Sequence, residues 1–108
     1  MKKSKLNAEV FENYQSVIVR TSGEILPMGM QRRKLYTLEL IKFCIHIKYA
    51  EFIKIEDDIY MIIDEMGLLK PNQIINNKAT YLLREKGIFN DEQYIVGDAM
   101  IIDINDIE

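Results

Sequence analysis

The sequence predicts an all-α fold in which helices pack in a stack around one long helix. Two observations carry this expectation. Residues 30–49 place apolar side chains at helical spacing on two adjoining stripes, and residues 57–66 and 72–86 show the same spacing on one face. Only two prolines and five glycines interrupt the 108 residues. A helix that is apolar over most of its circumference must be covered on two sides, so the long helix is expected in an inner layer.

The N-terminal part begins with a helical pattern over residues 6–19, for which Asn7 is a possible N-cap. Its last residues, 17–19, are β-branched and could instead form a strand. Residues 20–29 are predicted to be a connector, because two glycines and Pro27 punctuate them. The long helix over residues 30–49 follows.

Residues 51–56 alternate between polar and apolar side chains, as a short strand does. A helix over 57–66 is expected next, begun by Asp57 or Asp58 and ended by Gly67, and then a helix over 72–86 ended by Gly87. Gly97 and Asp98 separate two apolar runs and are typical of a tight hairpin turn.

These elements predict a single domain or domain fragment over residues 1–108, with a helical core at 30–86 and an acidic tail at 88–108. Whether residues 93–104 form a hairpin, a helix or a disordered tail stays open from the sequence. The net charge of −3 divides unevenly. Residues 1–50 carry nine Lys and Arg against four Asp and Glu, whereas residues 51–108 carry five against thirteen. Surfaces of opposite sign could steer partners.

The location expected from the sequence is cytoplasmic or nuclear. Cys44 is the only cysteine, so no disulfide can form within the chain. The basic start, Met1 to Lys5, has no apolar segment after it of the kind that a secretory signal carries. No apolar run approaches the length that a membrane-spanning helix needs, and we expect no membrane partner.

No catalytic arrangement is recognisable, and we expect no enzyme activity. His46 is the only histidine, and Cys44 lies two residues away, about 200° round the predicted helix, so the two side chains point apart. One Cys and one His cannot build a structural zinc site. The acidic tail lacks the spacing of a calcium loop, and no Gly-rich loop is present that could hold phosphate. We therefore expect no catalytic residue, no metal site and no cofactor.

One basic cluster has a defined setting. Arg32, Arg33 and Lys34 fall in the first turn of the predicted long helix. The helix dipole disfavours cations at that end by a few tenths of a kcal/mol each. The unfavourable placement indicates a contact with a partner, and Gly29 would allow a close approach to the start of the helix.

The segment 21–35 resembles a core motif of the SAPS family, the regulatory subunits of protein phosphatase 6. The residues that match the family spacing without a gap are Gly23, Glu24, Pro27, Gly29, Arg32 and Lys34. The resemblance extends over about residues 20–69 and departs from the family register at Thr37 and Glu39. It implies an α-helical repeat scaffold of the armadillo or HEAT kind, of which this chain would be a fragment. The implied function is binding a type 2A-like serine/threonine phosphatase catalytic subunit through Gly29, Arg32, Arg33 and Lys34.

The alternative fold is a winged helix-turn-helix that ends in a C-terminal hairpin, since the order of the elements from residue 30 onward also fits it. This alternative predicts a small DNA-binding protein whose recognition helix lies at residues 72–86. The nucleic-acid contacts would come from Asn72, Gln73, Asn76, Asn77, Lys78 and Arg84. The acidic charge of this half opposes phosphate binding, because DNA affinity depends on neutralising phosphates.

Overall fold

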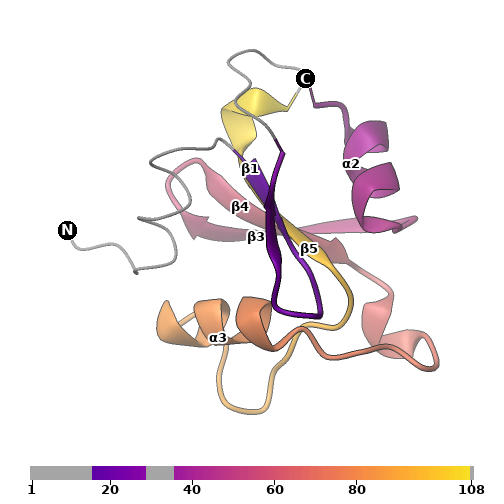
Figure 1. The fold of residues 1–108 in the computed structure, drawn as a ribbon. Coiled ribbons are helices and arrows are strands. Elements are labelled where there is room, and N and C mark those ends of the chain that lie inside the picture. The colour runs from indigo at the N-terminus through magenta and orange to yellow at the C-terminus, as the bar shows by residue number, and fades with distance from the viewer. Residues whose placement is uncertain (1–15, 29–35, 108) are drawn as a thin grey trace.

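The chain folds into a twisted antiparallel sheet with one helix on each side, as the computed structural model of residues 16–28 and 36–107 shows (Figure 1). Five strands make the sheet in the order β2-β1-β5-β4-β3. The elements in chain order are β1 (Ser16–Val19), β2 (Ile25–Pro27), α2 (Leu38–Ile45), β3 (Ala50–Glu56), β4 (Ile59–Asp64), α3 (Asn77–Glu85) and β5 (Ala99–Asp103). Two short 3₁₀ turns, Gly67–Leu69 and Ile104–Asp106, follow β4 and β5.

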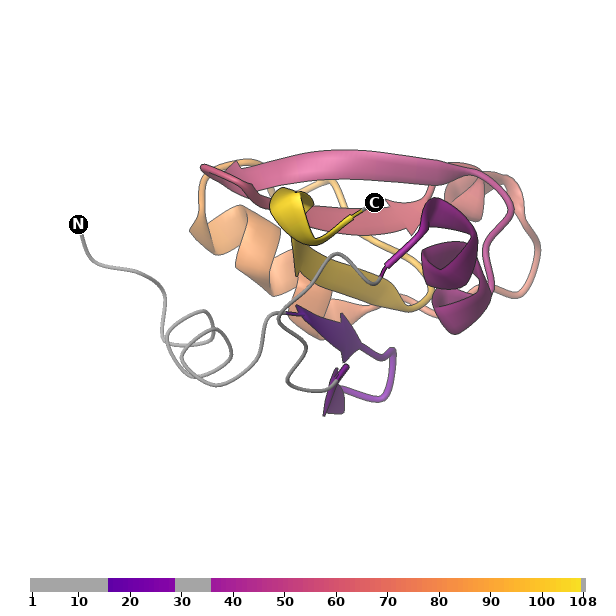
Figure 2. The ribbon, with the colours of Figure 1, turned by 90° about the horizontal axis from the view of Figure 1, so that it is seen from above.

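Alternation along the strands builds a separate apolar core on each face of the sheet. One core packs α3 against the sheet, and it contains Val17, Val19, Ile55, Met61, Ile63, Ala79, Leu82, Leu83, Ile95, Ala99 and Ile101. The other packs α2 against the opposite face, and it contains Ile18, Tyr36, Ile41, Ile45, Ile62, Met100 and Ile102. Figure 2, seen from above, separates the two helices from the strands between them. The sheet is therefore the middle of three layers.

The all-α prediction is wrong, and so are both of its forms, the helical-repeat fragment and the winged helix. The helix expected over 57–66 is the strand β4. Its residues 59–63 are apolar without a break, because a central strand of a three-layer fold is buried on both faces. Met61 points to the α3 core and Ile62 to the α2 core, and both are fully buried. Such a run satisfies helical spacing by default.

The long helix expected over 30–49 is also wrong in extent. Within the described residues, α2 covers only Leu38–Ile45, with Thr37 as its N-cap. His46 ends the helix in the left-handed conformation at φ 58°, and its amide donates to the carbonyl oxygens of Lys42 and Phe43. The chain then enters β3 at Ala50. The short strand predicted at 51–56 is confirmed as β3.

The hairpin expected around Gly97 and Asp98 does not form. Val96 makes an isolated bridge with Ile75, whereas β5 pairs with β1 on one side and β4 on the other. The segment named as an acidic tail thus supplies the central strand of the sheet, with Ala99, Met100 and Ile102 fully buried. A real hairpin lies earlier, between β1 and β2, in the stretch predicted to be a connector.

The helix predicted over 72–86 is present in a shorter form, as α3 (Asn77–Glu85). Asn76 is its N-cap, and Gly87 follows it at φ 76°. The helix predicted over 6–19 lies mostly outside the described residues, and residues 16–19 are β1. None of the described helices has the length and apolar character that a membrane span requires.

Gly67 provides a local test of how tightly the turn after β4 packs. A Cβ atom added at this residue would lie 2.7 Å from Val96 Cγ2. We expect Gly67→Ala to lower the free energy of unfolding by about 1–3 kcal/mol through this overlap. Urea unfolding of the variant and of Gly67→Ala combined with Val96→Ala measures the effect. The second change should restore part of the loss, and two strictly additive losses would contradict the proposed overlap.

Candidate interaction site at the edge of the sheet

The strand β3 lies at one edge of the sheet, and no described strand pairs with its outer side. It has seven residues, whereas β2 at the other edge has three and includes Pro27. A long unpaired edge offers a row of backbone donors and acceptors to another chain. Natural proteins shorten or block such edges unless they are used, so β3 is the edge of interest here.

The register of β3 against β4 determines which peptide groups are available. The amide of Glu65 donates to the carbonyl oxygen of Tyr49 at 2.9 Å. Tyr49 and Glu65 continue the register in which Glu51 pairs with Ile63 and Ile53 with Met61. Because hydrogen-bonded and non-hydrogen-bonded pairs alternate, the peptide groups of these odd-numbered residues of β3 point toward β4. Those of Ala50, Phe52 and Lys54 point outward.

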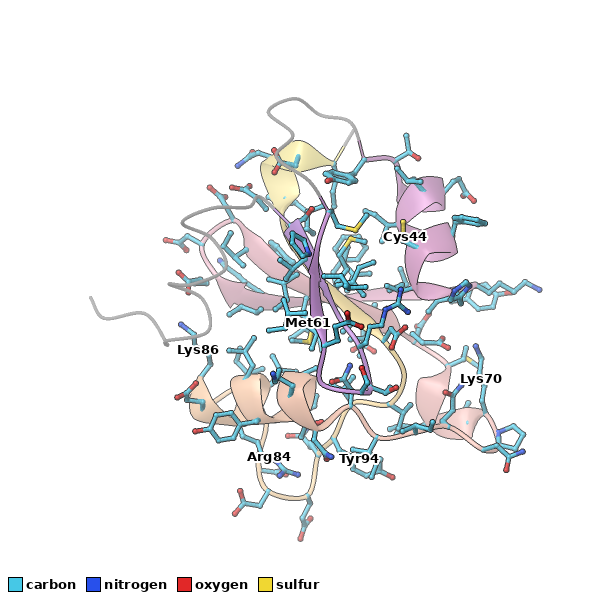
Figure 3. The ribbon with its side chains drawn as sticks, viewed as in Figure 1. Cys44, Met61, Lys70, Arg84, Lys86 and Tyr94 are labelled. Carbon is cyan, nitrogen blue, oxygen red and sulfur yellow. The ribbon has the colours of Figure 1, made fainter. Side chains whose placement is uncertain are left out.

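A groove borders β3 on the face that carries α3, and we call it the edge groove. Its volume is about 220 Å³. Its described lining residues are Glu51, Ile53, Ile63, Asp64, Glu65, Leu68, Phe89, Gln93, Tyr94, Ile95 and Val96. Leu68 is 64% exposed and Tyr94 is 42% exposed, so apolar surface on both is open to solvent. Figure 3 shows Tyr94 on the chain segment that follows α3, at the lower side of the molecule.

The residues around the edge groove are held by a local hydrogen-bond network. The Arg84 guanidinium donates to the carbonyl oxygens of Asn90, Asp91 and Gln93, at 2.9 to 3.2 Å. The hydroxyl of Thr80, on α3, accepts from the amide of Ile95 at 2.9 Å. These contacts fix the turn after α3 and with it the far wall of the groove. The groove is thus formed before any partner binds.

A second hollow lies on the opposite face, where α2 turns into β3. Its described lining residues are Glu39, Lys42, Phe43, His46, Ile47, Lys48 and Tyr49. Phe43 is 74% exposed and Tyr49 is 51% exposed. On the same face Phe52 packs edge-on against Tyr60, with ring centroids 6.3 Å apart. The edge of β3 is therefore flanked by exposed apolar side chains on both faces of the sheet.

A polar cavity of about 340 Å³ lies at another end of the sheet. Its two carboxylates already have partners: Asp98 pairs with Arg20 at 3.1 Å and also accepts from the amide of Thr21, and Asp64 pairs with Lys70. The described residues contain no cluster of three or more His, Cys, Asp or Glu side chains that could hold a metal ion. The cavity thus offers fewer unused interactions than the edge of β3.

The structure disperses the residues predicted to contact nucleic acid. Asn76 is fully buried; its amide nitrogen donates to the carbonyl oxygens of Val19 and Gly97, and its oxygen accepts from the amide of Ala79. Arg84 is engaged with the turn described above. Asn77 and Lys78 are exposed on the first turn of α3. Asn72 and Gln73 line the polar cavity instead. The set does not form one surface.

The residues predicted to contact a phosphatase, Gly29, Arg32, Arg33 and Lys34, lie outside the described residues. His46 and Cys44 are on α2 and its C-cap, and burial raises the pKa of the Cys44 thiol. Sequence reasoning identified β3 as a strand but missed the edge groove. The alternation at 51–56 was the only available signal, because Leu68, Phe89 and Tyr94 reach the groove from distant parts of the chain.

Comparison of the chain with known proteins adds no assignment to this geometry. No protein-family model, curated protein or solved structure matches it.

Proposed function

We propose that this chain is a protein-binding module that accepts an extended segment of its partner along the outer edge of β3. The observation that carries the proposal is the seven-residue edge strand with outward-facing peptide groups, bordered by the edge groove. In strand addition, main-chain hydrogen bonds supply affinity and pockets for alternate side chains supply specificity. Both parts are available at β3.

The proposal keeps the sequence-based expectation of a macromolecular partner and changes the contact surface. A phosphatase catalytic subunit remains a proposal that rests on the SAPS resemblance alone. The helical scaffold that the resemblance implies is not the fold of this chain, so no helix face is proposed as the contact. DNA binding loses its geometric support, because Asn76 and Arg84 use their polar groups within the fold.

The features of β3 fit selective pairing rather than indiscriminate aggregation. Its edge carries three charged side chains, Glu51, Lys54 and Glu56, and the register shifts between Lys54 and Glu56. Charges and irregularities of this kind discourage pairing between identical flat edges. They leave the central residues of the strand available to a segment of matching chemistry.

A proline at residue 54 tests the outward peptide groups directly. Lys54→Pro removes an outward N–H and leaves the bonds between β3 and β4 in place, because edge strands tolerate proline at such positions. Lys54→Ala keeps the N–H and removes only an exposed side chain, whose ion pair with Asp57 is solvated. The probe is a library of random 12-residue peptides displayed on phage.

We expect the wild-type chain to enrich peptides that then bind Lys54→Pro about tenfold more weakly, the equivalent of one lost hydrogen bond. The same peptides should bind Lys54→Ala within about twofold. Equal binding to all three chains, or failure to enrich any peptide, would refute strand addition.

Hydrogen exchange provides a second measurement that does not depend on the proline variant folding. In the free chain the amides of Phe52 and Lys54 should exchange faster than that of Ile53, because they point outward. Saturation with an enriched peptide should slow exchange at Phe52 and Lys54 most. Protection confined to residues outside β3 and the edge groove would count against the proposal.

A further inference from the structure

The chemistry of the segment that β3 accepts follows from the residues on the groove side of the strand. This step rests on the proposed function. Glu51, Ile53 and Ile55 share the face that carries α3, and Glu51 and Ile53 line the edge groove. A strand added beside β3 would place every second side chain on this face, over the mouth of the groove. Ile53 is half-buried and apolar, so a facing apolar side chain would cover it and enter the groove.

The rim of the groove is acidic. Glu51 and Glu65 are both exposed and both line it. The third lining carboxylate, Asp64, pairs with Lys70. None of the described lining residues is a lysine or an arginine. The rim therefore has two carboxylates that a cation from a partner could approach, and the net charge of −3 acts in the same direction at longer range.

The two requirements combine into a short pattern if the added strand runs antiparallel to β3, as every pair in this sheet does. A partner residue that faces Ile53 is followed two residues later by the residue that faces Glu51. We infer that the partner segment carries a large apolar residue and, two residues further toward its C-terminus, a lysine or arginine. The apolar side chain fills the mouth of the groove, and the cation lies beside Glu51 and Glu65.

A second copy of this chain meets the requirement less well. Residues that face each other across paired strands share a face of the sheet. Glu51 could therefore face only the odd-numbered residues of a second β3, and Lys54 is on the other face. In a pair centred on Ile53, Glu51 faces Ile55, and in a pair centred on Phe52, it faces Ile53. Neither arrangement brings a cation to the acidic rim, which favours a basic segment of a different protein.

The test uses the displayed 12-residue library and two variants with equal change in charge. Glu51→Gln combined with Glu65→Gln neutralises the rim. Glu24→Gln combined with Glu85→Gln neutralises two exposed carboxylates away from the groove, in the β1–β2 turn and on α3. Synthetic versions of an enriched peptide, with its basic residue kept or replaced by glutamine, are titrated against all three chains in low salt and in 0.5 M NaCl, a flagged concentration of about the strength needed to screen exposed charges.

The enriched peptides should share the apolar, any residue, Lys or Arg pattern. The rim variant should bind the basic peptide about three- to tenfold more weakly in low salt, as expected for one or two exposed ion pairs. The control variant should bind it nearly as the wild-type chain does, and the glutamine peptide should not distinguish the chains. High salt should reduce the difference.

Each other outcome is decisive. Enriched peptides that need the Lys54 amide but show no basic preference would overturn this inference and leave strand addition intact. Peptides whose binding is indifferent to Lys54→Pro would overturn both. Sedimentation that shows a dimer of the wild-type chain, lost in Lys54→Pro, would identify a second copy as the occupant and overturn the basic partner.

Discussion

Asn76→Ala is expected to lower the free energy of unfolding by about 3 kcal/mol. The alanine removes the N-cap of α3, which stabilises by about 1 kcal/mol. It also leaves the carbonyl oxygens of Val19 and Gly97 without the donor that Asn76 supplies in a fully buried setting, at about 1 kcal/mol each. For a domain of this size the melting temperature should fall by roughly 15 °C.

Thermal and urea unfolding followed by circular dichroism measure this effect, and the next residue provides the control. Asn77→Ala changes an exposed residue on the first turn of the same helix and should shift stability by less than about 0.5 kcal/mol. Asn76→Asp separates the two contributions, because the carboxylate keeps the cap acceptor and loses both donated bonds. Equal stability of Asn76→Ala and Asn77→Ala would show that Asn76 does not link α3 to β1.

Ile41→Ala is expected to lower the free energy of unfolding by about 2–5 kcal/mol. Ile41 is fully buried between α2 and the sheet, in the core that contains Ile62, Met100 and Ile102. Truncation removes buried methyl groups and leaves a cavity that the surrounding side chains fill only in part. Phe43→Ala on the same helix should have a much smaller effect, because Phe43 is 74% exposed. Urea unfolding of both variants gives the comparison.

This pair of variants also tests the three-layer arrangement. A sheet covered on one face only would leave α2 as a dispensable surface element, and Ile41→Ala would then cost no more than Phe43→Ala. That result would contradict the second core. In the three-layer fold both cores share the central strands β5 and β4, so unfolding of Ile41→Ala should remain a single cooperative transition at a lower midpoint.

The sequence by itself determined several local features of the fold. Alternation over 51–56 correctly predicted β3, because an edge strand is polar on its exposed positions and shows its period. The helical spacing at 72–86 and Gly87 predicted α3 and its end, because α3 buries one face and exposes the other. In each case the local pattern carries the environment of the element.

Only the tertiary structure decided the rest. Residues 59–63 and 99–102 are apolar on both faces, so their sequences lack the alternation that separates a strand from a helix. β5 pairs with β1 across about 80 residues of sequence, and no local signal predicts such a partner. The edge groove likewise depends on β3, the turn after β4 and the segment after α3 meeting in space. The physical reason is the same throughout: burial on two sides erases the period of a strand, and long-range pairing selects its neighbours.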